Sequence, residues 1–147
     1  MGWDEVEERL AATLRGLAEG TSAVADAAPA REAVTRRRRL GGLVGERRGM
    51  VRAYVQWLRI DDTLHCECVG GPQVGGTFPW SDAEHAALLA LGWSAPVHAR
   101  VPTYTRVWTG SDAGDDVLTL AAQLAVRTFR DVLGSAEPDG VTVQVNT

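Results

Sequence analysis

The chain has 147 residues, a length that suits a single domain with a sizeable core. Its hydrophobic fraction of 45% and charged fraction of 23% are ordinary for a globular protein. No apolar run approaches the roughly 20 residues that span a bilayer, and the N-terminus has neither the basic leader nor the apolar core of a signal peptide. The sequence therefore predicts one cytoplasmic domain over residues 1–147, without a membrane-spanning segment.

The positive charge is concentrated in one stretch. All 15 basic residues are arginine, which we attribute to the codon bias of a GC-rich genome. Residues 31–52 hold eight arginines against Glu32 and Glu46, a balance of +6, so the rest of the chain stands at −10 within a total of −4. Such a block is expected to meet nucleic acid, an acidic partner or the acidic face of a second copy, unless it is only a solvated loop. No aromatic residue lies between Trp3 and Tyr54, so the block lacks the stacking platforms of single-strand binders.

A first helix is predicted to begin at Trp3 or Asp4 and to end near Gly20. Glutamates crowd its first turn, where the helix dipole favours negative charge. Four apolar residues recur at a spacing of three to four and form one stripe: Val6, Leu10, Leu14 and Leu17.

The segment after this helix is the hardest to interpret. Residues 22–27 fit a short strand and residues 30–40 fit a helix. Four glycines are expected to break any long element here: Gly41, Gly42, Gly45 and Gly49. We therefore treat residues 28–49 as an arginine-rich connecting segment within the domain.

Two strands joined by a tight turn are predicted next. Residues 50–60 are rich in β-forming side chains, Asp61 and Asp62 suit a turn, and residues 63–69 are again β-forming. This order predicts an antiparallel hairpin.

A short helix is predicted over residues 81–91. Ser81 and Glu84 have the spacing of a capping box, in which each side chain accepts a hydrogen bond from the other residue's backbone amide. Gly92 is expected to end the helix.

The last third of the chain predicts strands, a long helix and a final strand. Residues 97–101 and 104–108 fit one or two strands, and residues 112–116 open the helix, which Gly134 closes. The helix carries the clearest apolar stripe of the chain: Val117, Leu118, Ala121, Leu124, Ala125, Phe129 and Val132. Residues 140–145 fit an edge strand or an ordered tail.

Cys66 and Cys68 are the first candidates for chemistry. On a strand they share one face, while His65 points to the other. A zinc site needs two further ligands, and the sequence has no second cysteine pair. We interpret the two thiols as small buried hydrophobes and expect neither a metal nor another cofactor. No phosphate-binding glycine loop and no catalytic motif is present.

Aromatic and basic residues supply the candidate contact surface. The tryptophans are expected to combine core anchors with one or two exposed contact residues. The candidate partner-binding residues are Arg36, Arg37, Arg38, Arg39, Arg47, Arg48, Trp57, Trp80 and Trp108.

The order of these elements resembles the type III secretion chaperone-like fold, also called YbjN-like, and most closely its TY-Chap branch of small actinobacterial proteins. The likeness is carried by Trp3-Asp4 and the helix after them, by residues 54–56, 64–70, 81–93 and 124–132, and by Trp108. The arginine-rich residues 28–49 are longer than the resemblance leads us to expect. The resemblance implies an α+β fold, with a mainly antiparallel sheet and helices packed on one face. It also implies a non-enzymatic, usually dimeric binding module for peptides or proteins, with no catalytic residues.

Three classes of function remain open at this stage. The first is a chaperone-like binder of a specific protein client, acting as a homodimer or hetero-oligomer, for which an unpaired sheet edge or face offers a binding surface. The alternative is a charge-directed nucleic-acid binder that uses residues 31–52. An enzyme with an unrecognised site is the third.

Overall fold

The computed structural model describes residues 2–38, 44–96, 101–109 and 115–146, and gives the backbone alone for residues 35–38, 44–47 and 115. The elements run in the order α1 (Trp3–Arg15), β1 (Ser22–Arg38), β2 (Val44–Ile60), β3 (Thr63–Val69), the short 3-10 turn η1 (Pro72–Val74), α2 (Asp82–Leu91), β4 (Thr103–Trp108), α3 (Asp115–Arg127), its π-helical continuation η3 (Thr128–Val132), η4 (Pro138–Gly140) and β5 (Val141–Asn146). Over these described ranges, no helix is long and apolar enough to cross a bilayer.

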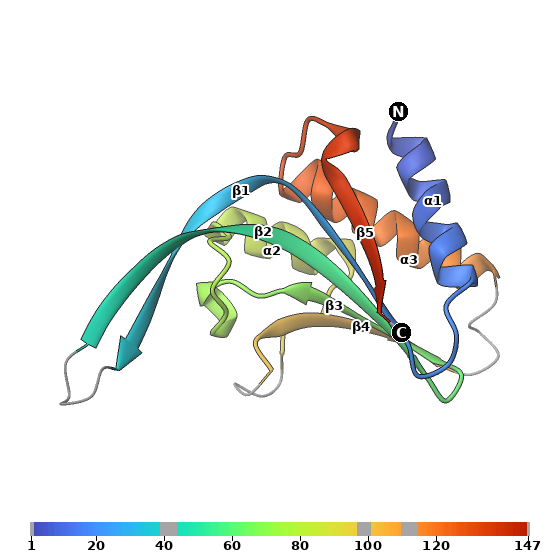
Figure 1. Ribbon diagram of the computed structural model, residues 1–147, viewed down its shortest axis with the longest axis horizontal. Helices are drawn as coiled ribbons and strands as arrows, with labels where there is room; N and C mark the ends of the chain where they lie inside the picture. The colour runs from blue at the N-terminus through green and yellow to red at the C-terminus, as the bar shows by residue number, and fades with distance from the viewer. Residues whose placement is uncertain (1, 39–43, 97–100, 110–114, 147) are drawn as a thin grey trace.

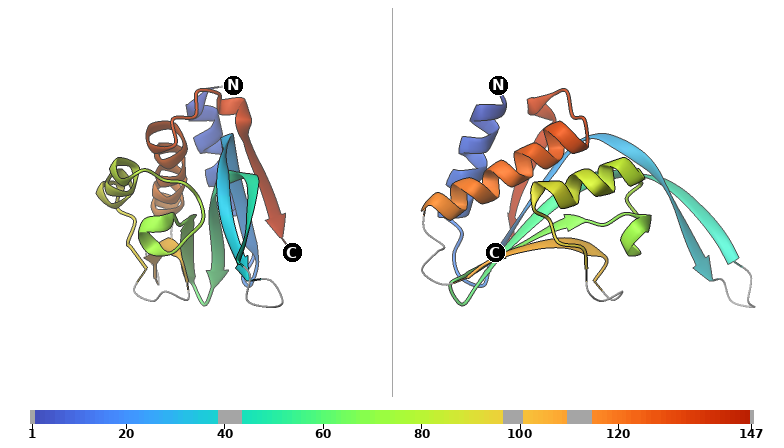
Figure 2. Two further views of the ribbon diagram at one scale, coloured as in Figure 1. Left: turned by 90° about the vertical axis from the view of Figure 1, so that its left-hand side faces the viewer. Right: turned by 180° about the vertical axis from the view of Figure 1, so that it is seen from behind.

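The strands form one five-stranded sheet in the order β4-β3-β2-β1-β5, and every neighbouring pair is antiparallel. The helices α1, α2 and α3 all lie on one face of this sheet, and none of the described helices covers the opposite face (Figures 1 and 2). This architecture confirms the predicted α+β class. The sheet also confirms the hairpin of β2 and β3, and it places β5 at an edge, paired with β1.

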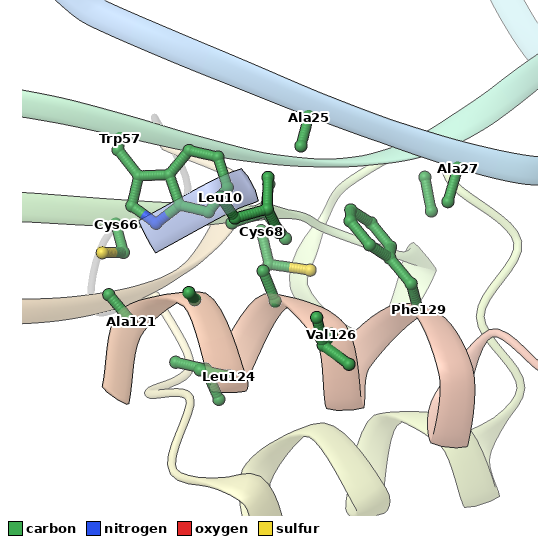
Figure 3. Close-up of a cluster of buried hydrophobic side chains, with 14 of the residues drawn as sticks. Leu10, Ala25, Ala27, Trp57, Cys66, Cys68, Ala121, Leu124, Val126 and Phe129 are labelled. Carbon is green, nitrogen blue, oxygen red and sulfur yellow. The ribbon is translucent and has the colours of Figure 1, made fainter. Parts of the chain in front are cut away.

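The core lies between the sheet and the helices. Alternate strand residues point toward the helices and are buried: Ala23, Ala25, Ala27, Ala53, Val55, Trp57, Leu64, Cys66 and Cys68. Val6 and Leu10 of α1 pack against them, together with Phe129 at the start of η3 (Figure 3). The small alanines on β1 let the helices approach the sheet closely, while Trp57 on the neighbouring strand fills much of the remaining space.

Helix ends agree with the sequence in two cases and differ in one. The capping box of α2 is present, with Ser81 and Glu84 exchanging hydrogen bonds at 2.9 and 3.1 Å. Gly92 closes α2 in the left-handed conformation, at φ 114°. The first helix, however, ends at Arg15 with Gly16 as its C-cap, earlier than the predicted Gly20, although Leu17 is still buried one turn further on.

The prediction of a helix over residues 30–40 is wrong for its described part. β1 continues to Arg38, and β2 begins at Val44 and runs through Gly45 and Gly49 without a break. Pairing between the two long strands overrides the weak helical preference of this segment. A bulge between Ala27 and Arg31 marks the point where the two strands leave the main sheet. We call residues 31–38 and 44–51 the arm; it projects away from the helices in Figure 1.

Two other predictions fall partly outside the description. Of the predicted strand over residues 97–101, only Val101 is described, and it is not in a strand. Residues 112–114, at the expected start of the long helix, also lie outside the described residues. The strand predicted at 104–108 is present as β4, and the long apolar stripe is present in α3 and η3.

Candidate functional site

Arg31 fixes the base of the arm to the helix layer. Its guanidinium donates hydrogen bonds to both carboxylate oxygens of Glu84 on α2, at 2.7 and 2.8 Å, and to the carbonyl oxygens of Pro79 and Leu133. The hydrogen bond from Arg31 is the main cause that holds the pKa of Glu84 below its ordinary value. Arg31 therefore belongs to the structural frame of the domain, although it is part of the basic block.

The side chains of two other arginines of the block are described, Arg52 and Arg48. Arg52 binds Asp26 at 2.9 Å and the carbonyl oxygen of Gly140. Arg48, on the arm, is well exposed and lies 3.8 Å from Glu32. The backbone positions of four further candidates lie at the far end of the arm: Arg36, Arg37, Arg38 and Arg47. Arg39 lies outside the described residues.

The three candidate tryptophans have different environments. Trp57 is 1% exposed and Trp80 is 3% exposed, so neither is available to touch a partner in this fold. Trp80 donates a hydrogen bond from Nε1 to the carbonyl oxygen of Val69, and its ring and that of Phe78 lie beside the Arg31 guanidinium. Trp108 alone remains half-buried at the surface, with the guanidinium of Arg106 over its ring at 5.1 Å.

Cys66 and Cys68 point into the core from one face of β3, as predicted. Both are free thiols, and burial raises the pKa of each above its ordinary value. His65 lies on the opposite face of the same strand. In the part of the chain that the structure describes, no three His, Cys, Asp or Glu side chains gather as a metal site would require. The two thiols serve as core packing.

The uncovered face of the sheet forms a broad surface; a free face or edge was expected from the sequence, but the residues that form it were not identified. Two rows of Cα partners cross it from β4 to β5, and we call these ten residues the open sheet face: Val107, His65, Leu58, Ser22, Asn146, Thr105, Glu67, Gln56, Val24 and Gln144. A shallow hollow of about 150 Å³ lies on this face, lined by Gln56, Leu58, Ile60, His65 and Glu67. The alternation of apolar and polar residues along β3, with His65 and Glu67 between Leu64, Cys66 and Cys68, was the available sequence signal for it.

A family model described as T3SS (YopN, CesT) and YbjN peptide-binding chaperone 3, or TY-Chap3, matches residues 1–147. The chain belongs to this family. No curated protein and no solved structure matches the chain. The TY-Chap3 match spans every element of the sheet and helices, and it confirms the resemblance to the type III secretion chaperone-like, YbjN-like family and its TY-Chap branch.

Membership of the TY-Chap3 family supports a chaperone-like binding role, because the family is a peptide-binding chaperone domain. Two surfaces of this TY-Chap3 chain are open to such a role, the open sheet face and the arm. Both are built without a catalytic constellation among the residues described above.

Proposed function

We propose that this protein is a non-enzymatic, chaperone-like module that binds a specific protein client on the open sheet face. One observation carries the proposal: α1, α2 and α3 all cover the same side of the sheet, so the other side is free to receive a polypeptide (Figure 2). The family's peptide-binding role supports the same conclusion. We expect it to act in the cytoplasm, where free thiols such as those of Cys66 and Cys68 remain reduced.

The composition of the open sheet face suits a polypeptide. Val107 is 46% exposed and lies beside His65, which in turn lies beside Leu58 in the same row. The next row places Glu67 beside Gln56. Apolar side chains among hydrogen-bonding groups are typical of protein interfaces, which combine an apolar centre with a polar rim. The hollow at Leu58 is too small for a drug-sized ligand, which needs at least about 300 Å³, but it can take part of one side chain of a client.

The arm is the second contact region in the proposal. Its arginines extend beyond the open sheet face, where an acidic region of the client would meet them. An acidic protein fits better than nucleic acid, because the rest of the chain carries a charge of −10 and would repel phosphate. The block also lacks the interleaved aromatic residues on which bases stack.

A homodimer is part of the same proposal. Seven of the ten residues of helix α2 are apolar, yet Leu88 is the one residue of this helix that is fully buried. Four of its apolar residues face solvent: Ala83, Ala86, Leu89 and Ala90. A second copy packed on this side of α2 would remove them from water, which favours association.

The test is co-purification from the native host followed by mass spectrometry, with variants of the open sheet face. Leu58→Glu combined with Val107→Glu places two carboxylates in one row and should abolish recovery of the client. Ala12→Glu adds the same kind of charge to an exposed position on α1, on the other side of the molecule, and should leave recovery unchanged. Equal recovery with the double variant and with wild type would refute the open sheet face as the client site.

A further inference from the structure

A groove on the helix side of the molecule is separate from the open sheet face and from the arm. It lies between the C-terminal end of α2, the middle of α3 and the helix-facing side of β4, and its volume is about 180 Å³. We call it the β4 groove; the residues that matter below are Leu91, Arg106, Trp108, Leu120, Leu124 and Arg127.

The groove exists because the helix layer stops short of the end of β4. Tyr104, Arg106 and Trp108 alternate along β4 and face the helices, opposite the buried residues of β3. Tyr104 is fully buried, and its hydroxyl contacts Nδ1 of His85 on α2 at 2.5 Å. Two residues further on, α2 has ended, so Arg106 is exposed and Trp108 is only half-buried. The far end of β4 therefore presents side chains that the helices do not cover.

The walls of the groove are apolar and its charge is positive. Leu120 of α3 is 51% exposed, which is unusual for a leucine on a helix packed against a sheet. Arg106 lies over the ring of Trp108, and Arg127 comes from the last turn of α3. Among the described residues, those that line the groove include no carboxylate. Two acidic residues flank the lining residues on this helix: Asp116 lies four residues before Leu120, and Asp131, which Arg130 binds at 2.8 Å, lies four residues after Arg127.

We propose that the β4 groove binds an acidic-apolar segment of a polypeptide, with a carboxylate between Arg106 and Arg127 and a leucine-type side chain against Trp108 and Leu120. The inference rests on the proposed peptide-binding function and names the chemistry of the segment that this second site selects. Charge complementarity carries it, since two guanidinium groups beside an apolar floor are matched by a carboxylate next to an apolar side chain. A volume of about 180 Å³ is enough for one such side chain and its neighbour's carboxylate.

Binding in this groove relies on side chains and does not add a strand at Thr105. The backbone N–H of Ser94 donates to the carbonyl oxygen of Thr105 at 2.9 Å, and the N–H of Thr105 donates to the carbonyl oxygen of Ser94 at 3.0 Å. These two bonds occupy the outer edge of β4 at its centre, where an added strand would need the same groups. Recognition here consequently depends on the arginines, and charge substitutions provide a sharp test.

The experiment uses short fluorescein-labelled peptides in which Leu alternates with Glu, with Gln or with Lys, titrated with the protein and followed by fluorescence anisotropy. The Glu peptide should bind about tenfold more tightly than the Gln peptide, the difference expected for one charge-assisted hydrogen bond, and the Lys peptide should bind most weakly. Because the basic block could also attract the Glu peptide, this comparison is made in proteins that carry glutamine at Arg36, Arg37, Arg38, Arg39, Arg47 and Arg48. In that background, Arg106→Gln combined with Arg127→Gln should make the Glu and Gln peptides bind equally. Both positions lie at the surface, so the variant is expected to fold, and circular dichroism verifies this.

Arg130→Gln, made together with Asp131→Asn so that no carboxylate is freed near Arg127, is the control, because it removes an arginine one turn along the helix, outside the groove. It should preserve the preference for the Glu peptide. Equal binding of the Glu and Gln peptides to wild type, absence of saturable binding, or an equal loss with the Arg130→Gln control would each overturn the inference.

The capture experiment on the open sheet face is independent of these peptides. If the protein recovers a client but shows no preference for the Glu peptide, the groove proposal is refuted and the client site stands. If it prefers the Glu peptide but recovers no client, the proposed client site is refuted and the groove stands.

Discussion

Arg31 on β1 and Glu84 on α2 form a two-point ion pair, and the same carboxylate also completes the N-terminal cap of α2. Oε1 of Glu84 accepts from the backbone N–H of Ser81 as well as from Arg31. One side chain thus joins the start of a helix to the base of the arm, 53 residues away in sequence. Loss of Arg31 would therefore disturb both the base of the arm and the cap of α2.

Arg31→Ala should lower the free energy of unfolding by about 2 kcal/mol, since it removes a partly buried, bidentate partner of a carboxylate. Urea unfolding followed by tryptophan fluorescence measures the change. Arg48→Ala removes an exposed arginine paired at 3.8 Å and should cost less than about 0.5 kcal/mol. Equal costs for the two variants would show that the anchor at Arg31 has no special role.

The same pair predicts how stability depends on pH. Because the pKa of Glu84 is lower in the folded chain than its ordinary value of 4.5, the unfolded chain takes up this proton first on acidification. The stabilisation from the ionised carboxylate is therefore complete well above pH 4.5 and is lost as the pH falls through the folded value. The stability gap between wild type and Glu84→Gln should narrow over this range.

Ser81→Ala should lower the free energy of unfolding by about 1 kcal/mol, the usual loss for an N-cap hydroxyl. The hydroxyl of Ser81 accepts the backbone N–H of Glu84 at 3.1 Å, and alanine would leave that N–H without this partner. Thermal unfolding of both proteins measures the effect. Ser94→Ala, at an exposed serine that holds β4 through its backbone alone, is the control and should melt like wild type. An unchanged melting temperature for Ser81→Ala would mean that the cap adds no stability.

Cys66 and Cys68 should not react with a thiol reagent in the folded protein at pH 8. Burial hides both sulfur atoms and raises the pKa of each thiol, so the reactive thiolate is scarce at that pH. Both should react in denaturant, and metal analysis of the native protein should find no bound zinc or iron. Stoichiometric metal that disappears in Cys66→Ser would contradict the packing role.

Replacing six arginines of the basic block with glutamine should abolish capture of the client while the domain stays folded. These residues are Arg36, Arg37, Arg38, Arg39, Arg47 and Arg48. A matched variant with six lysines keeps the charge and should retain the client, because the interaction is electrostatic. Mobility shifts with mixed DNA and RNA should show no tight binding at physiological salt. Tight binding that survives this salt and vanishes in the glutamine variant would instead support the nucleic-acid alternative.

Leu89→Asp should convert the proposed homodimer into a monomer. Leu89 is 40% exposed on α2, and a carboxylate at its position would face its own copy across the contact. Light scattering at several protein concentrations measures the mass. A wild-type protein that is monomeric at every concentration would refute the dimer.

The elements with strong local signals were predicted correctly from the sequence. Alternation and the Asp61-Asp62 turn were enough for the hairpin of β2 and β3, and the Ser81 cap fixed the start of α2. The strand at residues 30–38 was missed because its pairing partner, not its own composition, determines its conformation. The same limit applies to the site. No single-sequence signal separates the buried Trp57 and Trp80 from the surface-lying Trp108, since the difference depends on which strand residues the helices cover.

The bulge between Ala27 and Arg31 divides each of the two long strands into a part that belongs to the core and a part that does not. Beyond Arg31, Ala33 is the last residue of β1 that is described as buried. Beyond this point the arm adds little to the core, and its amide protons should exchange with solvent far faster than those of the same strands below the bulge. For the same reason, the arm should tolerate being lengthened or shortened by two residues in each of its two paired strands. Such changes keep the alternation of the two strands and alter only how far the protein reaches toward its client.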